Sequence, residues 1–240
     1  MRVLSRRPGN GGIVGDLATG SGVGEAVAGV ETVVHAASAA GSRGNFWAVD
    51  VGGTRRLAVA AREAGVRHLV YVSIPGVDRV PYSYYHAKYA AEQVVAAAAV
   101  PYTVLRATQF YPLIALLLGL AHRASLLPVG AGWRAQPVDA GDVAAHIVER
   151  VAVGPAGGVT EFGGPEVLSA PELARGWLAA RGARGRVVPL PIPGSYSRAV
   201  REGGLLPAAD APRGTVAWAD WLARTHGESP YSSQWLRRGS

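Results

Sequence analysis

The sequence predicts an α/β fold organised around a doubly wound parallel sheet. Short apolar, β-branched runs alternate with alanine-rich stretches of helical length from the N-terminus to Arg106. Strands that are apolar along their whole length are typical of a parallel sheet covered by helices on both faces. With 49% hydrophobic residues among 240, the chain has enough apolar surface for a sizeable core, as one large domain or a domain with an appendage.

The N-terminal elements are short and lie between glycine-rich turns. Residues 3–5 and 13–15 favour strands, because valine, leucine and isoleucine dominate them. Residues 8–12 read Pro-Gly-Asn-Gly-Gly and predict a turn. A short helix is expected over 24–28, followed by a buried strand over 32–37.

Two longer helix–strand units follow. A helix over 51–64 is stopped by Gly65, and a strand over 68–73 comes next. A second helix over 84–98 leads to a strand over 102–106. This order indicates parallel strands joined by helical crossovers.

Beyond residue 113 the alternation becomes irregular. A helix is expected over 139–151, with Asp139 or Asp142 as its N-cap. Later features are a helix opened by Ser169 with Pro171 at an early position, a proline-punctuated extended stretch over 187–193, and tryptophans at Trp218, Trp221 and Trp235. We expect the sheet domain to occupy residues 1–150, and residues 151–240 to form a small C-terminal subdomain on the substrate side, not clearly independent.

The amino-acid composition limits the binding partners and the cellular location that we expect for the protein. The formal charge is +7, which permits an anionic partner, but the arginines are scattered and no nucleic-acid-binding motif is present. The chain has no cysteine, which excludes disulfides and fits a cytoplasmic location. The longest apolar stretch, 113–121, is far shorter than a membrane span, and early arginines interrupt any signal peptide. No metal-binding residues are predicted, and a homo-oligomer is left open.

Lys88 is the single lysine among 24 basic residues, and it lies four residues after Tyr84. On a helix this spacing places the phenol and the ammonium on one face, one turn apart. An ammonium is a titratable point charge, whereas a guanidinium stays charged, so a lysine kept against an arginine bias suggests chemistry. The ammonium favours the phenolate, which suits Tyr84 to proton exchange. The alternative is an ordinary surface pair.

The order of the sequence landmarks resembles a known family. It is similar to the atypical or extended short-chain dehydrogenases/reductases, closest to the NmrA-like and sugar-epimerase-like proteins, over about the first 170 residues. The resemblance implies a Rossmann-like, NAD(P)-binding sheet domain. The matching segments cover residues 2–9, 14–17, 32–38, 50–54, 65–73, 84–88, 102–106, 136–143 and 162–166.

The resemblance implies a role for each matching residue. Tyr84 would be the catalytic acid/base, Lys88 would lower its pKa and bind the nicotinamide ribose, and Ser73 would supply the catalytic hydroxyl, one residue out of register. The cofactor-binding residues would be Arg6 and Arg7 at the adenosine phosphate of NADP, Asp16 near the adenine, and His35, Ala36, Ala37 and Ser38 along the nucleotide cleft, together with Lys88. Each of these residues has an alternative interpretation. Arg6 and Arg7 would be ordinary exposed arginines, Asp16 would cap the following turn, and His35 would be packed at a strand end.

The sequence departs from the family at its start. Members begin with a strand, a glycine-rich turn and a helix that binds the pyrophosphate. This chain starts at what resembles the second strand, and the stretch 19–24 does not have the spacing of that turn. Three arrangements are open: the second strand pairs directly with the fourth, another chain supplies the missing strand, or the native protein starts upstream. NADP or NAD binding is expected to be weakened or lost.

Three functions are therefore weighed. The first is an NAD(P)-dependent oxidoreductase or epimerase-like protein that acts on a carbonyl or carbinol substrate through Tyr84 and Lys88. The second is a non-catalytic NAD(P) sensor like NmrA, and the third is a cofactor-independent remnant of the fold. The candidate substrate-wall residues are Gln109, Phe110, Tyr111 and Trp133.

Overall fold

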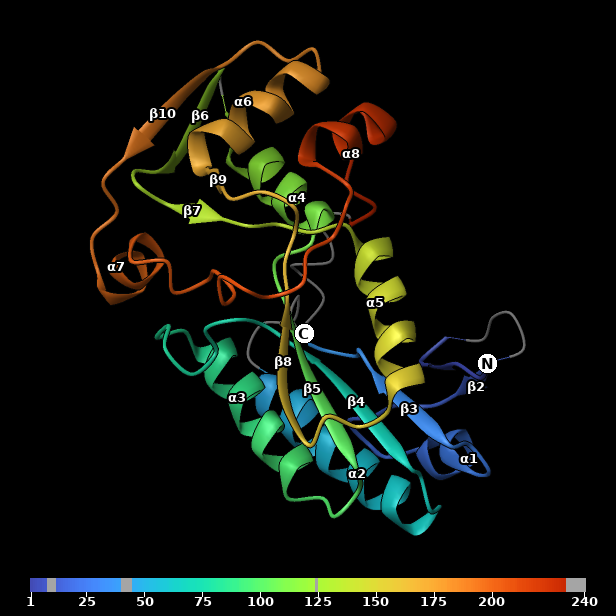
Figure 1. Cartoon of the computed structure of the whole chain (residues 1–240). Helices are drawn as coiled ribbons and strands as arrows, with labels where there is room; N and C mark the ends of the chain where they lie inside the picture. The colour runs from blue at the N-terminus through green and yellow to red at the C-terminus, as the bar shows by residue number, and fades with distance from the viewer. Residues whose placement is uncertain (8–11, 40–44, 124, 232–240) are drawn as a thin grey trace.

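The computed structural model describes residues 1–7, 12–39, 45–123 and 125–231 (Figure 1). Most of the turn expected over 8–12, and Trp235, lie outside the described residues. Among the described residues, no helix is long and apolar enough to cross a membrane.

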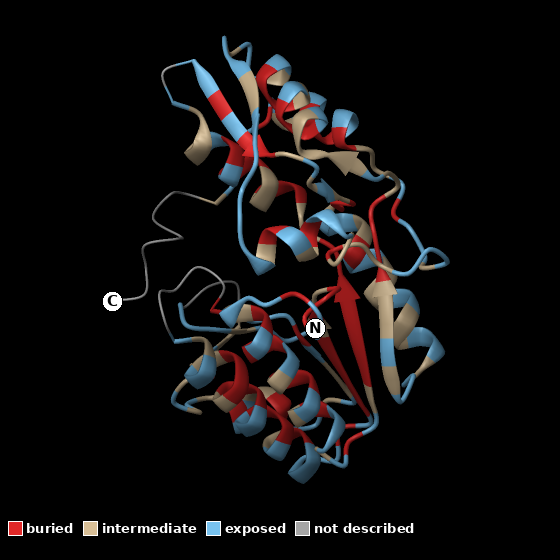
Figure 2. Cartoon of the chain, turned by 90° about the vertical axis from the view of Figure 1, so that its left-hand side faces the viewer, coloured by how far each residue is buried: buried red, intermediate tan, exposed pale blue. Residues whose placement is uncertain are grey.

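A four-stranded parallel sheet forms the centre of the N-terminal half, in the order β3-β4-β5-β8. Its central strands are buried along nearly their whole length (Figure 2), as their largely apolar sequences predict. The predicted α/β fold with a parallel sheet is therefore confirmed. The four strands are β3 (Thr32–His35), β4 (His68–Ser73), β5 (Tyr102–Ala107) and β8 (Gly158–Phe162).

Helices cover both faces of this sheet (Figure 1). On one face, Leu57, Leu69, Val95 and Val104 belong to a core shared by the helices and the strands. On the other face, Val143 packs with residues of β5 and β8. The first face carries a π-helical turn η1 (Trp47–Gly53), α2 (Thr54–Glu63) and α3 (Ser83–Ala96); the second carries α5 (Ala140–Val153).

The two N-terminal strands form a separate parallel pair. Strand β1 (Leu4–Ser5) pairs with β2 (Ile13–Val14), and α1 (Val23–Val27) follows. Within the described residues β1 does not pair with β3, so the arrangement in which the family's second strand joins its fourth is wrong for this structure. One edge of β1 and one edge of β3 therefore have no strand partner among the described residues.

The glycine-rich stretch 19–24 folds back on β2. Asp16 and Ser21 form an antiparallel bridge, and Gly22 has a φ of 70°, which favours glycine. A Cβ at Gly22 would lie 2.6 Å from the Val14 carbonyl oxygen. This stretch is therefore a tight turn that leads into α1, and Gly22 allows its backbone to pack closely on β2.

The region that the sequence leads us to expect on the substrate side has a second hydrophobic core, built around Tyr111, Trp177, Trp218 and Trp221. These side chains come from both sides of residue 150, so the division expected there stays a prediction. The elements of this region are α4 (Tyr111–Ala121), β6 (Leu126–Gly130) paired with β10 (Arg186–Leu190), β7 (Arg134–Ala135) paired with β9 (Leu168–Ser169), α6 (Ala170–Ala180), α7 (Ser195–Arg201) and α8 (Trp218–Thr225).

Two predicted helix caps in this part of the chain are confirmed. Asp139 accepts a hydrogen bond from the Gly141 amide at 2.7 Å and caps α5. Ser169 and Glu172 form a capping box at the start of α6. Asp142, the alternative cap, instead accepts from the amides of the segment before α8.

Candidate active site

The candidate site lies at the carboxyl ends of β3 and β4, where helix α3 begins. Tyr84 is the second residue of α3, and Lys88 follows one turn later on the same face. Ser38, in the segment after β3, places its Oγ 2.8 Å from the Tyr84 Oη. Three groups able to exchange or hold a proton thus come from two separate segments to one end of the sheet, the end where open α/β sheets bind ligands.

Lys88 is almost fully buried between α3 and the sheet. Its Nζ donates to the Val72 carbonyl oxygen at 2.7 Å and lies 4.0 Å from the centre of the Tyr71 ring. Burial lowers the pKa of Lys88 to about 8, although the nearby carboxylates of Asp50 and Glu92 oppose this shift. The ammonium is therefore the main form at neutral pH and becomes neutral only slightly above it.

Burial raises the pKa of Tyr84, and the hydrogen bond to Ser38 lowers it by a smaller amount. The sequence predicts that Lys88 shifts this phenol toward its anion; in the structure the ammonium is directed at Val72 and Tyr71 instead. Tyr84 is thus held as a neutral phenol at physiological pH. Its ring has aromatic neighbours on two sides, Phe46 at 5.1 Å and Tyr82 at 6.4 Å between ring centres.

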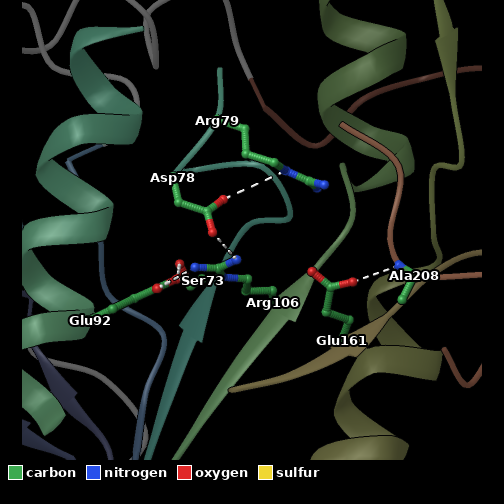
Figure 3. Close-up of polar contacts among 7 residues, drawn as sticks. All are labelled: Ser73, Asp78, Arg79, Glu92, Arg106, Glu161 and Ala208. Atoms are coloured by element: carbon green, nitrogen blue, oxygen red, sulfur yellow. Dashed lines mark hydrogen bonds and ion pairs between the residues drawn. The ribbon is translucent and has the colours of Figure 1, made fainter. Parts of the chain in front are cut away.

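Ser73, the sequence candidate for the catalytic hydroxyl, is buried at the end of β4. Its Oγ donates to the Glu92 carboxylate, which also binds Arg106 (Figure 3). Because its one proton is committed to Glu92, Ser73 is part of a buried ion network. The hydroxyl that contacts Tyr84 is that of Ser38, which the sequence assigned to the cofactor.

His35 points into the protein, away from the segment that follows β3. The hydroxyl of Thr54 donates to the Asp50 carbonyl, so His35 Nε2, 2.9 Å from that hydroxyl oxygen, is the donor to it. Burial, with a smaller effect of Lys88, lowers the pKa of His35 to about 3. His35 is therefore a neutral, packed imidazole, as the rival interpretation of the sequence had it.

Asp50 is a buried residue of the site to which the sequence assigned no role. Its Oδ2 accepts from the Ala39 amide at 3.0 Å and so holds the segment after β3, which carries Ser38. Its Oδ1 has no hydrogen-bond partner among the described residues. The charge of Asp50 raises the pKa values of Lys88, Tyr71 and Tyr84. A single acidic residue two positions before a glycine pair carries no signal, in one sequence, that it will be buried beside the site.

The other cofactor candidates are spread along the same edge of the fold. Arg6 and Arg7 are exposed just after β1, and Ala36 and Ala37 are exposed just after β3. Asp16 accepts from the Ala18 amide at 2.8 Å, so its carboxylate caps the turn that follows.

The expected substrate-wall residues have different positions. Trp133 lies 5.8 Å from the Tyr196 ring and donates to the Ser197 hydroxyl at 2.9 Å. Gln109 is half-buried after β5, and its side chain lies beside the Tyr85 hydroxyl. Phe110 packs beside β5, whereas Tyr111 is fully buried and donates to the Val216 carbonyl. Tyr111 is therefore core, and the expectation that it forms a wall is wrong.

The residues present fit the nicotinamide-ribose half of a dinucleotide. The Ser38 and Tyr84 hydroxyls are in contact at a strand end, and the buried Lys88 ammonium lies one helical turn further along α3. Hydroxyl and ammonium groups suit a ribose. For the pyrophosphate, no strand of the four-stranded sheet leads through a glycine-rich turn directly into a helix among the described residues.

Comparison with known proteins places this chain in a family. Residues 3–152, more than half of the chain, match the NAD(P)H-binding family. A 2-alkyl-3-oxoalkanoate reductase of Stenotrophomonas maltophilia (strain K279a) is 37% identical over an alignment of 105 residues, and the match covers 37% of this chain and 32% of that protein. The chain thus spans about a third of the length of this curated relative.

Solved structures share the fold at low sequence identity. A short-chain dehydrogenase/reductase superfamily protein from Agrobacterium tumefaciens, with bound NAD, has a TM-score of 0.70 and 21% identity, over 94% of this chain and 88% of that one. The NADPH-dependent quinone oxidoreductase QOR2 of Escherichia coli, in complex with NADPH, has a TM-score of 0.75 and 18% identity, over 93% and 89%. With the site geometry and the match over residues 3–152, we conclude that the chain belongs to the NAD(P)H-binding family, with the fold of the short-chain dehydrogenase/reductase superfamily.

Proposed function

We propose that this protein is an NAD(P)H-dependent reductase of a carbonyl substrate, with Tyr84 as the proton donor. The observation that carries the proposal is the 2.8 Å contact between the Tyr84 and Ser38 hydroxyls, one helical turn from the buried Lys88 ammonium. Tyr84, Ser38 and Lys88 are the residues to which we assign the chemistry, and Ser38 takes the part that the sequence gave to Ser73.

The state of each group suits this chemistry. When bound, the nicotinamide would supply a hydride to the carbonyl carbon. Burial raises the pKa of Tyr84, so the phenol carries the proton that the carbonyl oxygen needs. Ser38 orients that phenol through their hydrogen bond. The Lys88 ammonium, one turn along α3, is held at the Val72 carbonyl and the Tyr71 ring, and we assign it to the nicotinamide ribose. The cofactor-binding residues that we propose are Lys88, Ser38, Ala36 and Ala37, with Arg6, Arg7 and Asp16 toward the adenosine.

The proposal is tested by cofactor binding and turnover together. Calorimetry with NADPH and with NADH is expected to give binding, and oxidation of the bound form is followed with a carbonyl panel that includes a 3-oxo ester and a quinone. The 3-oxo ester is chosen because the Stenotrophomonas maltophilia relative is named for a 3-oxo acid. In Tyr84→Phe, turnover is expected to be lost while cofactor affinity stays.

The possible outcomes distinguish between the three functions that the sequence left open. Turnover that persists in Tyr84→Phe contradicts the assignment of Tyr84. Binding without turnover of any carbonyl supports a nucleotide sensor, and a folded protein that binds neither dinucleotide supports a cofactor-independent remnant.

Aromatic side chains lie next to Tyr84 and continue from it toward α7, which supports a substrate with an aromatic group. Tyr82, 48% exposed, lies 5.6 Å from the Tyr196 ring, and Tyr196 in turn contacts Trp133. These rings come from the N-terminus of α3, from α7 and from the turn before β7. Flat rings stack on aromatic side chains in offset or edge-on geometry.

Tyr82→Leu is therefore expected to raise KM for an aromatic ketone such as 1-tetralone by about 5- to 10-fold, since an aromatic pair contributes roughly 1 kcal/mol. KM for an aliphatic ketone should change little. Tyr89→Leu is the matched control, because Tyr89 is 41% exposed on the same helix but lines the outer groove with Trp47 and Val59. Equal effects of the two substitutions would contradict the aromatic subsite.

A further inference from the structure

Helix α3 presents a third functional side chain in line with Tyr84 and Lys88. Glu92 follows Lys88 by four residues, so the three side chains form one stripe along the helix. The Glu92 side chain is 3% exposed, which is rare for a carboxylate and requires a partner. The stripe thus ends, two turns from Tyr84, in a buried charge.

The partner of Glu92 is Arg106 on β5 (Figure 3). Arg106 Nε lies 3.0 Å from one Glu92 carboxylate oxygen, and Nη2 lies 2.7 Å from the other. The Arg106 side chain is 9% exposed. A bidentate pair of this kind fixes both distance and orientation, since two parallel bonds exclude rotation of either plane. Ser73, at the end of β4, donates to the same carboxylate. One residue of α3 is therefore bound to both central strands.

The same arginine also holds the segment that leads into Tyr84. Arg106 Nη1 donates to Asp78 at 3.0 Å, and Asp78 lies in the segment 74–82 between β4 and α3 (Figure 3). On its other side this segment contacts the substrate-side region, because Val77 and Val80 pack with Val200 and Leu205. Its path to Tyr84 is thus fixed from the sheet and from the C-terminal region.

We propose that Glu92 and Arg106 are positioning residues, which set the height and rotation of α3 on the sheet and thereby place Tyr84 and Lys88 for proton transfer. This inference rests on the proposed function for what the placement serves. If a buried ion pair only stabilises the fold, apolar side chains can replace it with little loss of stability, because the desolvation of the two charges offsets most of their attraction. If the pair instead positions α3, replacing it with apolar side chains displaces the helix and its side chains, even though the protein still folds.

The test separates these two roles by replacing the whole buried network at once. Removing one partner would leave an unpaired buried charge and unfold the protein. The variant Ser73→Ala/Glu92→Leu/Arg106→Met leaves none of the three polar groups buried and is expected to fold cooperatively. The exposed pair Glu31 and Arg67, with side chains 75% and 71% exposed, is the matched control as Glu31→Leu/Arg67→Met.

The first readout does not need activity. Lys88 is the single lysine of the chain, so 13Cε-labelled lysine gives one side-chain NMR signal. We expect this signal to move or broaden in the triple variant, and its pH titration to shift to lower pH, because Glu92 raises the pKa of Lys88. The control variant should leave the signal and its titration unchanged. A folded triple variant with the wild-type Lys88 signal overturns the proposal.

The second readout is turnover by the intact protein. We expect kcat to fall by about 10- to 100-fold in the triple variant, the loss typical of a reacting group displaced by about 1 Å, with cofactor Kd nearly unchanged. If the triple variant does not fold, Glu92→Asp keeps the charge and shortens the arm by one methylene. An unchanged Lys88 signal in Glu92→Asp likewise overturns the proposal. If the wild-type protein turns over no carbonyl, the proposed function fails, and the NMR result still decides whether the pair positions α3.

Discussion

Replacing Lys88 by methionine is expected to make the protein more stable and, at the same time, inactive. Burial lowers the pKa of Lys88 from 10.5 to about 8, so the folded state disfavours the ammonium that it contains at neutral pH. A shift of this size corresponds to roughly 3 kcal/mol of free energy of unfolding. Methionine is similar in length and carries no charge. After allowing about 1 kcal/mol for the lost bond to the Val72 carbonyl, we expect a net gain of about 2 kcal/mol.

The stability gained in Lys88→Met is expected to depend on pH. Between pH 8 and 10.5 the unfolded chain holds a proton on Lys88 that the folded chain has released, so the contribution of Lys88 to stability rises with pH across this window. The methionine variant lacks that rise. Urea unfolding at pH 7 and at pH 10 should therefore show a stability gain for Lys88→Met that is large at pH 7 and small at pH 10.

Arg79→Met is the control, because Arg79 is an exposed cation on the adjacent segment. Its substitution should leave the free energy of unfolding within about 0.5 kcal/mol of the wild-type value at both pH values. A Lys88→Met variant less stable than the wild type at pH 7 would mean that the ammonium stabilises the fold. The burial of this charge would then need no functional explanation. Arginine is a poorer probe, since its larger guanidinium does not fit a buried site of this size.

Parts of this site were predictable because their signals are local. The spacing of Tyr84 and Lys88 predicted a shared helix face, and both residues lie on α3 with that relation. Ser169 and the early Pro171 predicted a helix start, and α6 begins there with Ser169 as its N-cap. The largely apolar sequence of β4 predicted a strand buried on both faces. Each prediction depended on residues within one or two turns of one another.

The rest depended on contacts between distant segments. Ser73 lies at a strand end where a catalytic hydroxyl was expected, but the partner that takes its proton is Glu92, 19 residues later. Ser38 reaches Tyr84 across 46 residues. Helix α4 has apolar residues on every side, so its sequence carried no amphipathic period, and Tyr111 was taken for a wall residue although it begins this buried helix.

Acid is expected to unfold the protein through His35 in particular. Burial lowers the pKa of this imidazole from 6.5 to about 3, so between these values the unfolded chain binds a proton that the folded chain does not. The contribution of His35 is present in full above pH 6.5 and is lost as the pH falls toward 3. The loss amounts to about 4 kcal/mol at pH 3, enough to unfold many single domains.

His35→Gln should therefore unfold at lower pH than the wild type, since its amide nitrogen replaces the donor to Thr54 and does not titrate. Circular dichroism between pH 7 and pH 3 measures the midpoint, with His86→Gln on the exposed face of α3 as control. An acid midpoint that is the same in the His35 and His86 variants would contradict the prediction.

The same experiment bears on Lys88, because its charge also lowers the pKa of His35 and the Tyr71 ring contacts both side chains. In Lys88→Met the pKa of His35 should rise, and NMR titration of the imidazole measures that rise directly. The acid midpoint should then fall as well. An imidazole pKa that does not respond to Lys88→Met would show that the two buried groups titrate independently, and that the charge of Lys88 is not felt beyond the ring on which it lies.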